Sequence, residues 1–127
     1  MSDPGRPTVQ SVQKAVAARF RFPVEMMRNP SRKREYAHPR QLAMALARDL
    51  TGLSLPQIGR MFNRDHTTVI CAIKRTNWRN EHKADHRRHF DELRAELIYA
   101  DNWKSILATQ IQACMAVGLF LHALGAY

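Results

Sequence analysis

A chain of 127 residues with a formal net charge of +9 is long enough for one domain with a modest core. Its two cysteines are far apart and show no Cys-x-x-Cys spacing, so we expect neither a disulfide framework nor a zinc finger. Because the first 20 residues contain no continuous apolar stretch, we expect no secretory signal peptide and predict a cytoplasmic protein.

The excess positive charge is concentrated in the middle of the chain. Residues 28–79 contain eleven basic and three acidic groups, which is a net charge of +8. Residues 1–27 carry a net charge of +2, and residues 80–127 carry a net charge of −1. We therefore expect a polyanionic partner to bind the middle segment.

The N-terminal quarter predicts a short lead, one helix and a basic loop. Residues 1–7 are typical of a disordered lead, and Thr8 is a suitable N-cap for a helix whose apolar side includes Phe20. Pro23 is expected to start a short helical turn. Residues 28–36, RNPSRKREY, are rich in basic residues and lack apolar periodicity, so they predict an exposed loop.

Two helix-start signals follow the basic loop. Pro39 is expected near the first position of a helix that ends at Gly52, a residue suited to a C-cap. In LSLPQI, residues 53–58, Ser54 is a suitable N-cap and Gln57 completes a capping box. The helix that begins there is expected to end near Phe62.

A second helix follows after a very short turn. Residues 63–64 form the turn, Asp65 caps the next helix, and that helix is expected to run from His66 to about Trp78. Two helices joined so tightly indicate a helix-turn-helix, in which the start of the second helix meets the edges of DNA bases. Residues adjacent on one helical turn diverge from the axis, so a catalytic hydroxyl–imidazole–carboxylate relay in RDHTTV, residues 64–69, is not expected, and we predict no catalytic residue.

The stretch SRKREYAHPRQLAMALARDLTGLSLPQIGRMFNRDHTTVICAIKR resembles the C-terminal DNA-binding domain of the bacterial replication initiator DnaA. The resemblance covers roughly residues 9–97, and its most specific parts are PRQLAMALARDLT, SLPQIG and RDHTTV. It implies an all-α helical bundle with a helix-turn-helix, in a domain spanning residues 8–97, that binds double-stranded DNA at a nine-base-pair DnaA box.

Matching positions imply roles for individual residues. Arg32 would enter the minor groove, the residues of the next helix would contact phosphate or bases, and the start of the second helix-turn-helix helix would read the major groove. Cys71 stands where the family usually has a base-contacting histidine, and the turn FNRD is one residue shorter than the common FGGRD. The residues that the resemblance assigns to DNA binding are Arg32, Arg40, Gln41, Arg48, Thr51, Leu55, Pro56, Arg64, Asp65, His66, Thr67, Thr68 and Cys71.

The sequence contains no GxxxxGK[ST] phosphate-binding loop, so we expect no ATPase module, no bound nucleotide, no cofactor and no enzymatic activity in these residues. We expect instead a nucleoid-associated regulator that occupies DnaA-box-like sites and modulates replication initiation or transcription. The alternative is a membrane-associated or protein-interaction adaptor in which the apolar C-terminal tail dominates.

Two features near the C-terminus leave alternatives open. Residues 98–127 predict an additional apolar helix. Its segment 106–127 fits a helix packed on the domain or on a second copy as a homodimer, peripheral membrane contact, or a spanning anchor. His82, His86 and His89 are spaced along one predicted helix face, where a metal site competes with a solvated polar face. No fourth ligand is evident, so we predict no metal.

Overall fold

The computed structural model describes residues 7–99, which contain helices and no strand. The all-α prediction is therefore confirmed for this range. The predicted lead falls mainly on residues 1–6, and most of the predicted apolar C-terminal helix falls on residues 100–127; both ranges lie outside the described residues. The elements in chain order are α1 (Val9–Phe20), η1 (Val24–Met27, a 3-10 helix), α2 (Arg34–Thr51), α3 (Leu55–Met61), α4 (His66–His82) and α5 (Ala84–Tyr99).

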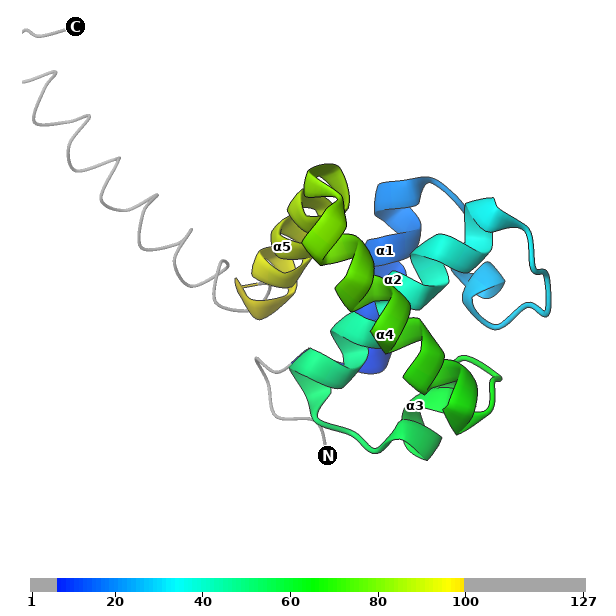
Figure 1. Cartoon of the computed structure of the whole chain (residues 1–127). Coiled ribbons are helices and arrows are strands. Elements are labelled where there is room, and N and C mark those ends of the chain that lie inside the picture. Colours follow the sequence, from blue (N-terminus) through cyan, green and yellow to red (C-terminus); the bar gives the residue numbers. More distant parts are fainter. Residues whose placement is uncertain (1–6, 100–127) are drawn as a thin grey trace, which may run out of the picture.

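Helix α2 is central to the packing and contacts α1, α3, α4 and α5 (Figure 1). Helix α4 crosses α2 and leads from α3 to α5, which also packs against α1. Apolar residues from all five helices and from η1 meet in one core, so α5 is part of the same domain. The largest fully buried side chains are Phe62, Met27, Leu42, Met44, Leu46, Ile58, Leu93, Val12, Val16, Val69 and Thr76.

Helix α1 starts where predicted, but Phe20, the last position of its predicted apolar side, is not buried. Thr8 caps the helix and forms a reciprocal capping box with Ser11. Phe20, expected on the inner face, is 37% exposed and lies against the ring of His89, with centroids 5.8 Å apart. The helix ends at Arg21 in a left-handed conformation, and this turn directs Phe22 toward the core in place of Phe20.

Helix α2 begins five residues earlier than predicted. Its first residue is Arg34, and Pro39 lies inside the helix. The Ala37 N–H donates to the Lys33 carbonyl at 2.8 Å, which closes the first turn before the proline is reached. Tyr36 packs edge-on against Phe22 at 5.5 Å, so a contact with another segment holds this turn in place. The basic loop is correspondingly shorter than the predicted range 28–36.

Helix α4 extends to His82, four residues beyond the predicted end. The extended backbone of Lys83 separates α4 from α5, so His82 belongs to α4 whereas His86 and His89 belong to α5. The expected single helix face with three histidines is therefore wrong. Among residues 7–99, no group of three or more metal-ligating side chains is placed to hold an ion. No helix in this range combines the length and apolar character needed to span a bilayer.

Candidate nucleic-acid interface

Helix α3, the turn that follows it, and α4 form the predicted helix-turn-helix. Ser54 begins α3: its Oγ accepts a hydrogen bond from the Gln57 N–H, and Gln57 Oε1 accepts one from the Ser54 N–H at 3.0 Å. The chain then reverses through Asn63, whose φ is 54°, and the Arg64 N–H donates to the Gly59 carbonyl at 2.8 Å. Because Gly59 has no side chain, the turn lies directly against α3 and sets where α4 begins.

The first turn of α4 presents polar side chains to solvent. Asp65 occupies the N-cap position, but its carboxylate bonds to neighbouring side chains instead of the helix backbone. Oδ2 accepts from Thr67 Oγ1 at 2.5 Å, and Oδ1 lies 3.1 Å from His66 Nδ1. The Thr67 bond is the main reason that the pKa of Asp65 lies below its ordinary value. Since the histidine and the threonine use different oxygens of one carboxylate, they form no proton relay.

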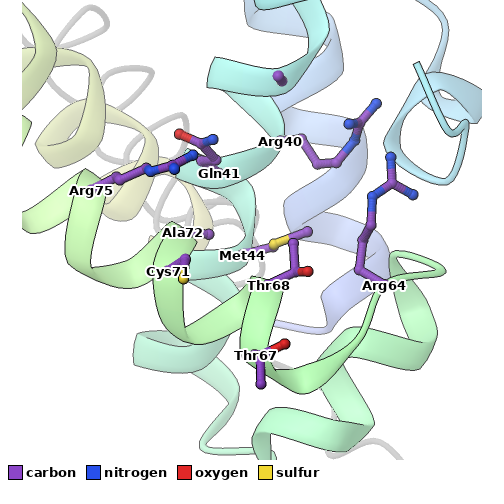
Figure 2. Close-up of a pocket in the computed structure, with 10 residues that line it drawn as sticks. Arg40, Gln41, Met44, Arg64, Thr67, Thr68, Cys71, Ala72 and Arg75 are labelled. Atoms are coloured by element: carbon purple, nitrogen blue, oxygen red, sulfur yellow. The ribbon is translucent and has the colours of Figure 1, made fainter. Parts of the chain in front are cut away.

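An open hollow of about 300 Å³ lies between α2 and α4 (Figure 2). Its lining comes from the middle of α2, from the helix-turn-helix turn, and from the first three turns of α4. Six of the thirteen residues predicted from the sequence meet here, although up to 31 positions separate them along the chain. The residues that line it are Ala37, Arg40, Gln41, Met44, Arg64, Thr67, Thr68, Cys71, Ala72 and Arg75.

Arg40 differs from the exposed contact that we expected. It is only 4% exposed, and its guanidinium donates to the Ser31 carbonyl at 3.0 Å and to the Met26 carbonyl at 2.7 Å. Burial and the nearby Arg64 lower its pKa to about 10. Arg40 therefore ties η1 and the basic loop to α2, and little of its side chain is left for an external partner.

Arg64 joins the basic loop to the helix-turn-helix turn. Its Nη2 donates to the Asn29 carbonyl at 2.5 Å, while Nη1 donates to the carbonyls of Phe62 and Asn63. Burial, followed by the charge of Arg32, lowers the pKa of Arg64. Arg32 itself is exposed on the loop. Arg40 and Arg64 thus hold the loop in position, and Arg32 extends from it.

Four of the seven predicted residues that do not line the hollow lie near the junction of α2 and α3. Arg48 is exposed, and its guanidinium donates to the Leu53 carbonyl. Thr51 Oγ1 donates to the Ala47 carbonyl at 2.5 Å. Pro56 is exposed and Leu55 is half-buried at the start of α3. These residues form a second group at the junction of α2 and α3, and none of them lines the hollow.

The sequence reasoning missed two arginines on α4. Arg75 is exposed and lines the hollow beside Cys71, whose free thiol is also exposed. Arg79 is half-buried, and its Nη1 donates to Gln41 Oε1 at 2.7 Å, so the amide oxygen of Gln41 is already occupied. The spacing of seven and eleven residues from Thr68 places both arginines on the face of α4 that carries Thr68, and this signal was available in the sequence.

Comparison with known proteins identifies the family to which these residues belong. Residues 9–76 match the family described as the bacterial DnaA protein helix-turn-helix. The chain belongs to the bacterial DnaA helix-turn-helix family. It is 49% identical over 69 residues to the chromosomal replication initiator protein DnaA of Acinetobacter baumannii, a match that covers 54% of this chain and 15% of that protein. The Thermoanaerobacter sp. protein of the same name is 42% identical over 92 residues, or 71% of this chain and 20% of that protein.

The chain thus contains a DnaA-like DNA-binding domain, and it spans a small part of the length of these relatives. The matched family is the helix-turn-helix and not the ATPase module. The family match ends at residue 76, within α4, so the last turn of α4 and all of α5 lie beyond it. Helix α5 nevertheless places Leu93 and Leu97 in the core, which makes it a structural part of this DnaA-like domain.

Proposed function

We propose that this protein binds double-stranded DNA at DnaA-box-like sites and thereby regulates replication initiation or transcription in the nucleoid. The observation that carries the proposal is the hollow between α2 and α4, where the exposed residues Thr67, Thr68 and Cys71 of α4 lie beside Gln41 of α2. Arg40 and Arg64, which hold the basic loop, line the same hollow. Membership of the DnaA helix-turn-helix family and the net charge of +8 on residues 28–79 support the same partner.

The proposed division of roles follows from exposure. His66, Thr67 and Thr68 are exposed at the start of α4, so they read base edges in the major groove, with Asp65 holding the first two in position. Cys71, one turn further along, faces the next base. A thiol is a weak hydrogen-bond donor, so this position discriminates poorly between bases.

Other residues position the domain on the duplex. Arg32 extends from the basic loop into the minor groove, and Arg48 and Thr51 contact the backbone near the start of α3. Leu55 and Pro56 approach a thymine methyl group. Arg40 and Arg64 act indirectly, because their hydrogen bonds hold the basic loop in place. Gln41 offers DNA only its amide N–H groups, because its oxygen already accepts a hydrogen bond from Arg79.

The deciding experiment compares a duplex containing a DnaA box with a shuffled duplex of the same composition. A good base contact is worth roughly 1–3 kcal/mol, so Thr68→Ala or His66→Ala should reduce the preference for the box by about 5-fold to 150-fold. Weak, salt-sensitive binding to both duplexes should remain, because phosphate contacts are independent of sequence.

Arg87→Ala provides the matched control. Arg87 lies on α5 and pairs with Asp91 at 3.6 Å, so its loss changes the net charge without touching the proposed interface. Equal affinity of the unaltered protein for both duplexes would refute sequence-specific binding, and an affinity independent of salt would refute DNA binding through the basic segment. Occupancy mapping across a bacterial genome then tests whether the bound sites lie at origins or promoters.

A further inference from the structure

A basic stripe continues along α4 beyond the residues proposed to read bases. Arg75 and Arg79 follow Thr68 at intervals of seven and eleven residues, and an α-helix with 3.6 residues per turn returns both to nearly the same side. Lys83 follows directly after the end of α4 and is exposed. We call Arg75, Arg79 and Lys83 the distal basic stripe.

The stripe has no acidic partner among residues 7–99: each ion pair within this range is made by other residues. Glu81 is thirteen positions after Thr68, which places it on the opposite side of α4. The effect of the uncompensated charge is seen at His38 of α2. Burial lowers the pKa of His38 first, and Arg79, Arg34, Lys83 and Arg75 then lower it further.

The length of α4 carries Arg79, in the distal basic stripe, past the groove. Eleven residues of α-helix span about 16 Å, whereas the major groove of DNA is about 12 Å wide and 8.5 Å deep. When Thr68 meets a base edge, Arg79 is therefore carried past the groove to the level of the sugar–phosphate chain. Lys83 comes four residues after Arg79 and directly follows His82, the last residue of α4.

We propose that Arg79 and Lys83, at the far end of the distal basic stripe, bind DNA phosphates that flank the recognised box on one side. This inference rests on the proposed function, because it assumes that the start of α4 lies in the major groove. It extends the interface to the last turn of α4 and the residue that follows, which lie beyond the segment matched by the family.

Arg79 is held in position for such a contact. Gln41 Oε1 accepts from its Nη1 at 2.7 Å, which orients the guanidinium and leaves its other N–H groups available. Burial, and then the charge of Arg75, lowers the pKa of Arg79. A phosphate beside the two arginines would relieve their repulsion, and a guanidinium binds phosphate in a bidentate manner.

The test uses a box with short flanks and two longer duplexes that extend the flank on one side or the other. The unaltered protein should gain affinity on extension of one side only. Arg79→Ala combined with Lys83→Ala should abolish that gain. Lys83→Ala alone should reduce the gain and leave affinity for the short duplex unchanged, because Lys83 makes no contact with the residues proposed to read the box. Loss of two phosphate contacts makes the slope of log affinity against log salt concentration shallower by about 1.8. Between 50 and 200 mM salt, the double variant should therefore lose about tenfold less affinity than the unaltered protein.

A second double variant removes the same charge from another surface. Arg87 and Arg88 on α5 pair with Asp91 and Asp85 at 3.6 and 3.7 Å, and replacing both arginines with alanine should leave the flank-dependent gain intact. Arg79→Lys combined with native Lys83 should retain most of the gain, because it keeps the charge. Thermal unfolding of each variant in the absence of DNA establishes that the fold is preserved.

The outcomes separate this inference from the proposed function. If the unaltered protein binds the box but gains nothing from either flank, or if both double variants lose the gain equally, the distal basic stripe is not a phosphate-binding surface. If the unaltered protein does not prefer the box in any duplex, the proposed function itself fails. Loss of the gain in the Arg79 and Lys83 double variant alone supports the inference.

Discussion

Gly59→Ala should destabilise the domain, although alanine is the better helix former. A Cβ at position 59 would lie 2.5 Å from the backbone carbonyl oxygen of Arg64, and ordinary contact begins at 3.4 Å. The turn would have to move by about 0.9 Å, the difference between these two distances. The backbone of the turn cannot rotate away as a flexible side chain can. It is also held in place, because the Arg64 N–H donates a hydrogen bond to the Gly59 carbonyl at 2.8 Å.

The size of the effect follows from two opposing contributions. Replacing a helical glycine by alanine favours the helix by about 1 kcal/mol. Overpacking costs about 1–3 kcal/mol, and the contact at Gly59 is with backbone, which places it toward the upper part of that range. We therefore expect the free energy of unfolding to fall by about 1–2 kcal/mol, measured by urea denaturation. The melting temperature should fall by about 4–8 °C for each kcal/mol.

Gly52→Ala is the control for this substitution. No atom lies within 4 Å of a Cβ at Gly52, but its φ of 67° is left-handed, so alanine there costs about 1–2 kcal/mol through the backbone alone. Both variants should lose stability, whereas only Gly59→Ala moves the start of α4 and should also weaken box binding under conditions where the protein is folded. A Gly59→Ala variant as stable as the unaltered protein would show that the turn yields freely and that this reasoning is wrong.

Three further predictions concern the loop, the histidines and the reading end of α4. Arg40→Met removes the hydrogen bonds to the Met26 carbonyl of η1 and the Ser31 carbonyl of the loop, so the free energy of unfolding should fall by about 2–3 kcal/mol. Amide exchange in residues 29–33 should accelerate, as measured by mass spectrometry. Burial, with nearby cations, holds the pKa values of His38 and His86 below 6.5, so the unfolded chain takes up protons first as the pH falls through 6.5. Denaturation at several pH values should show stability decreasing below that point, and His86→Gln should flatten the decrease. Cys71→His should sharpen base preference at one position in a selection on randomised duplexes, and identical preference profiles for the two proteins would show that position 71 does not face a base.

Local signals in the sequence determined where several elements begin and end. Ser54 and Gln57 predicted the start of α3, Thr8 predicted the start of α1, and Gly52 predicted the end of α2, because capping depends on residues a few positions apart. The short turn between two helices indicated the helix-turn-helix in the same way. The concentration of basic residues in positions 28–79 indicated a polyanionic partner before any fold was known.

Contacts between distant segments could be decided only by the tertiary structure. Arg40 and Arg32 both appear as basic residues next to a loop, but Arg40 is buried because the carbonyls of Met26 and Ser31 converge on it, whereas Arg32 meets no such partners and is exposed. The start of α2 likewise depended on the packing of Tyr36, a contact between side chains fourteen positions apart. Periodicity and capping describe one helix at a time, while the burial of a charge depends on which other segments surround it.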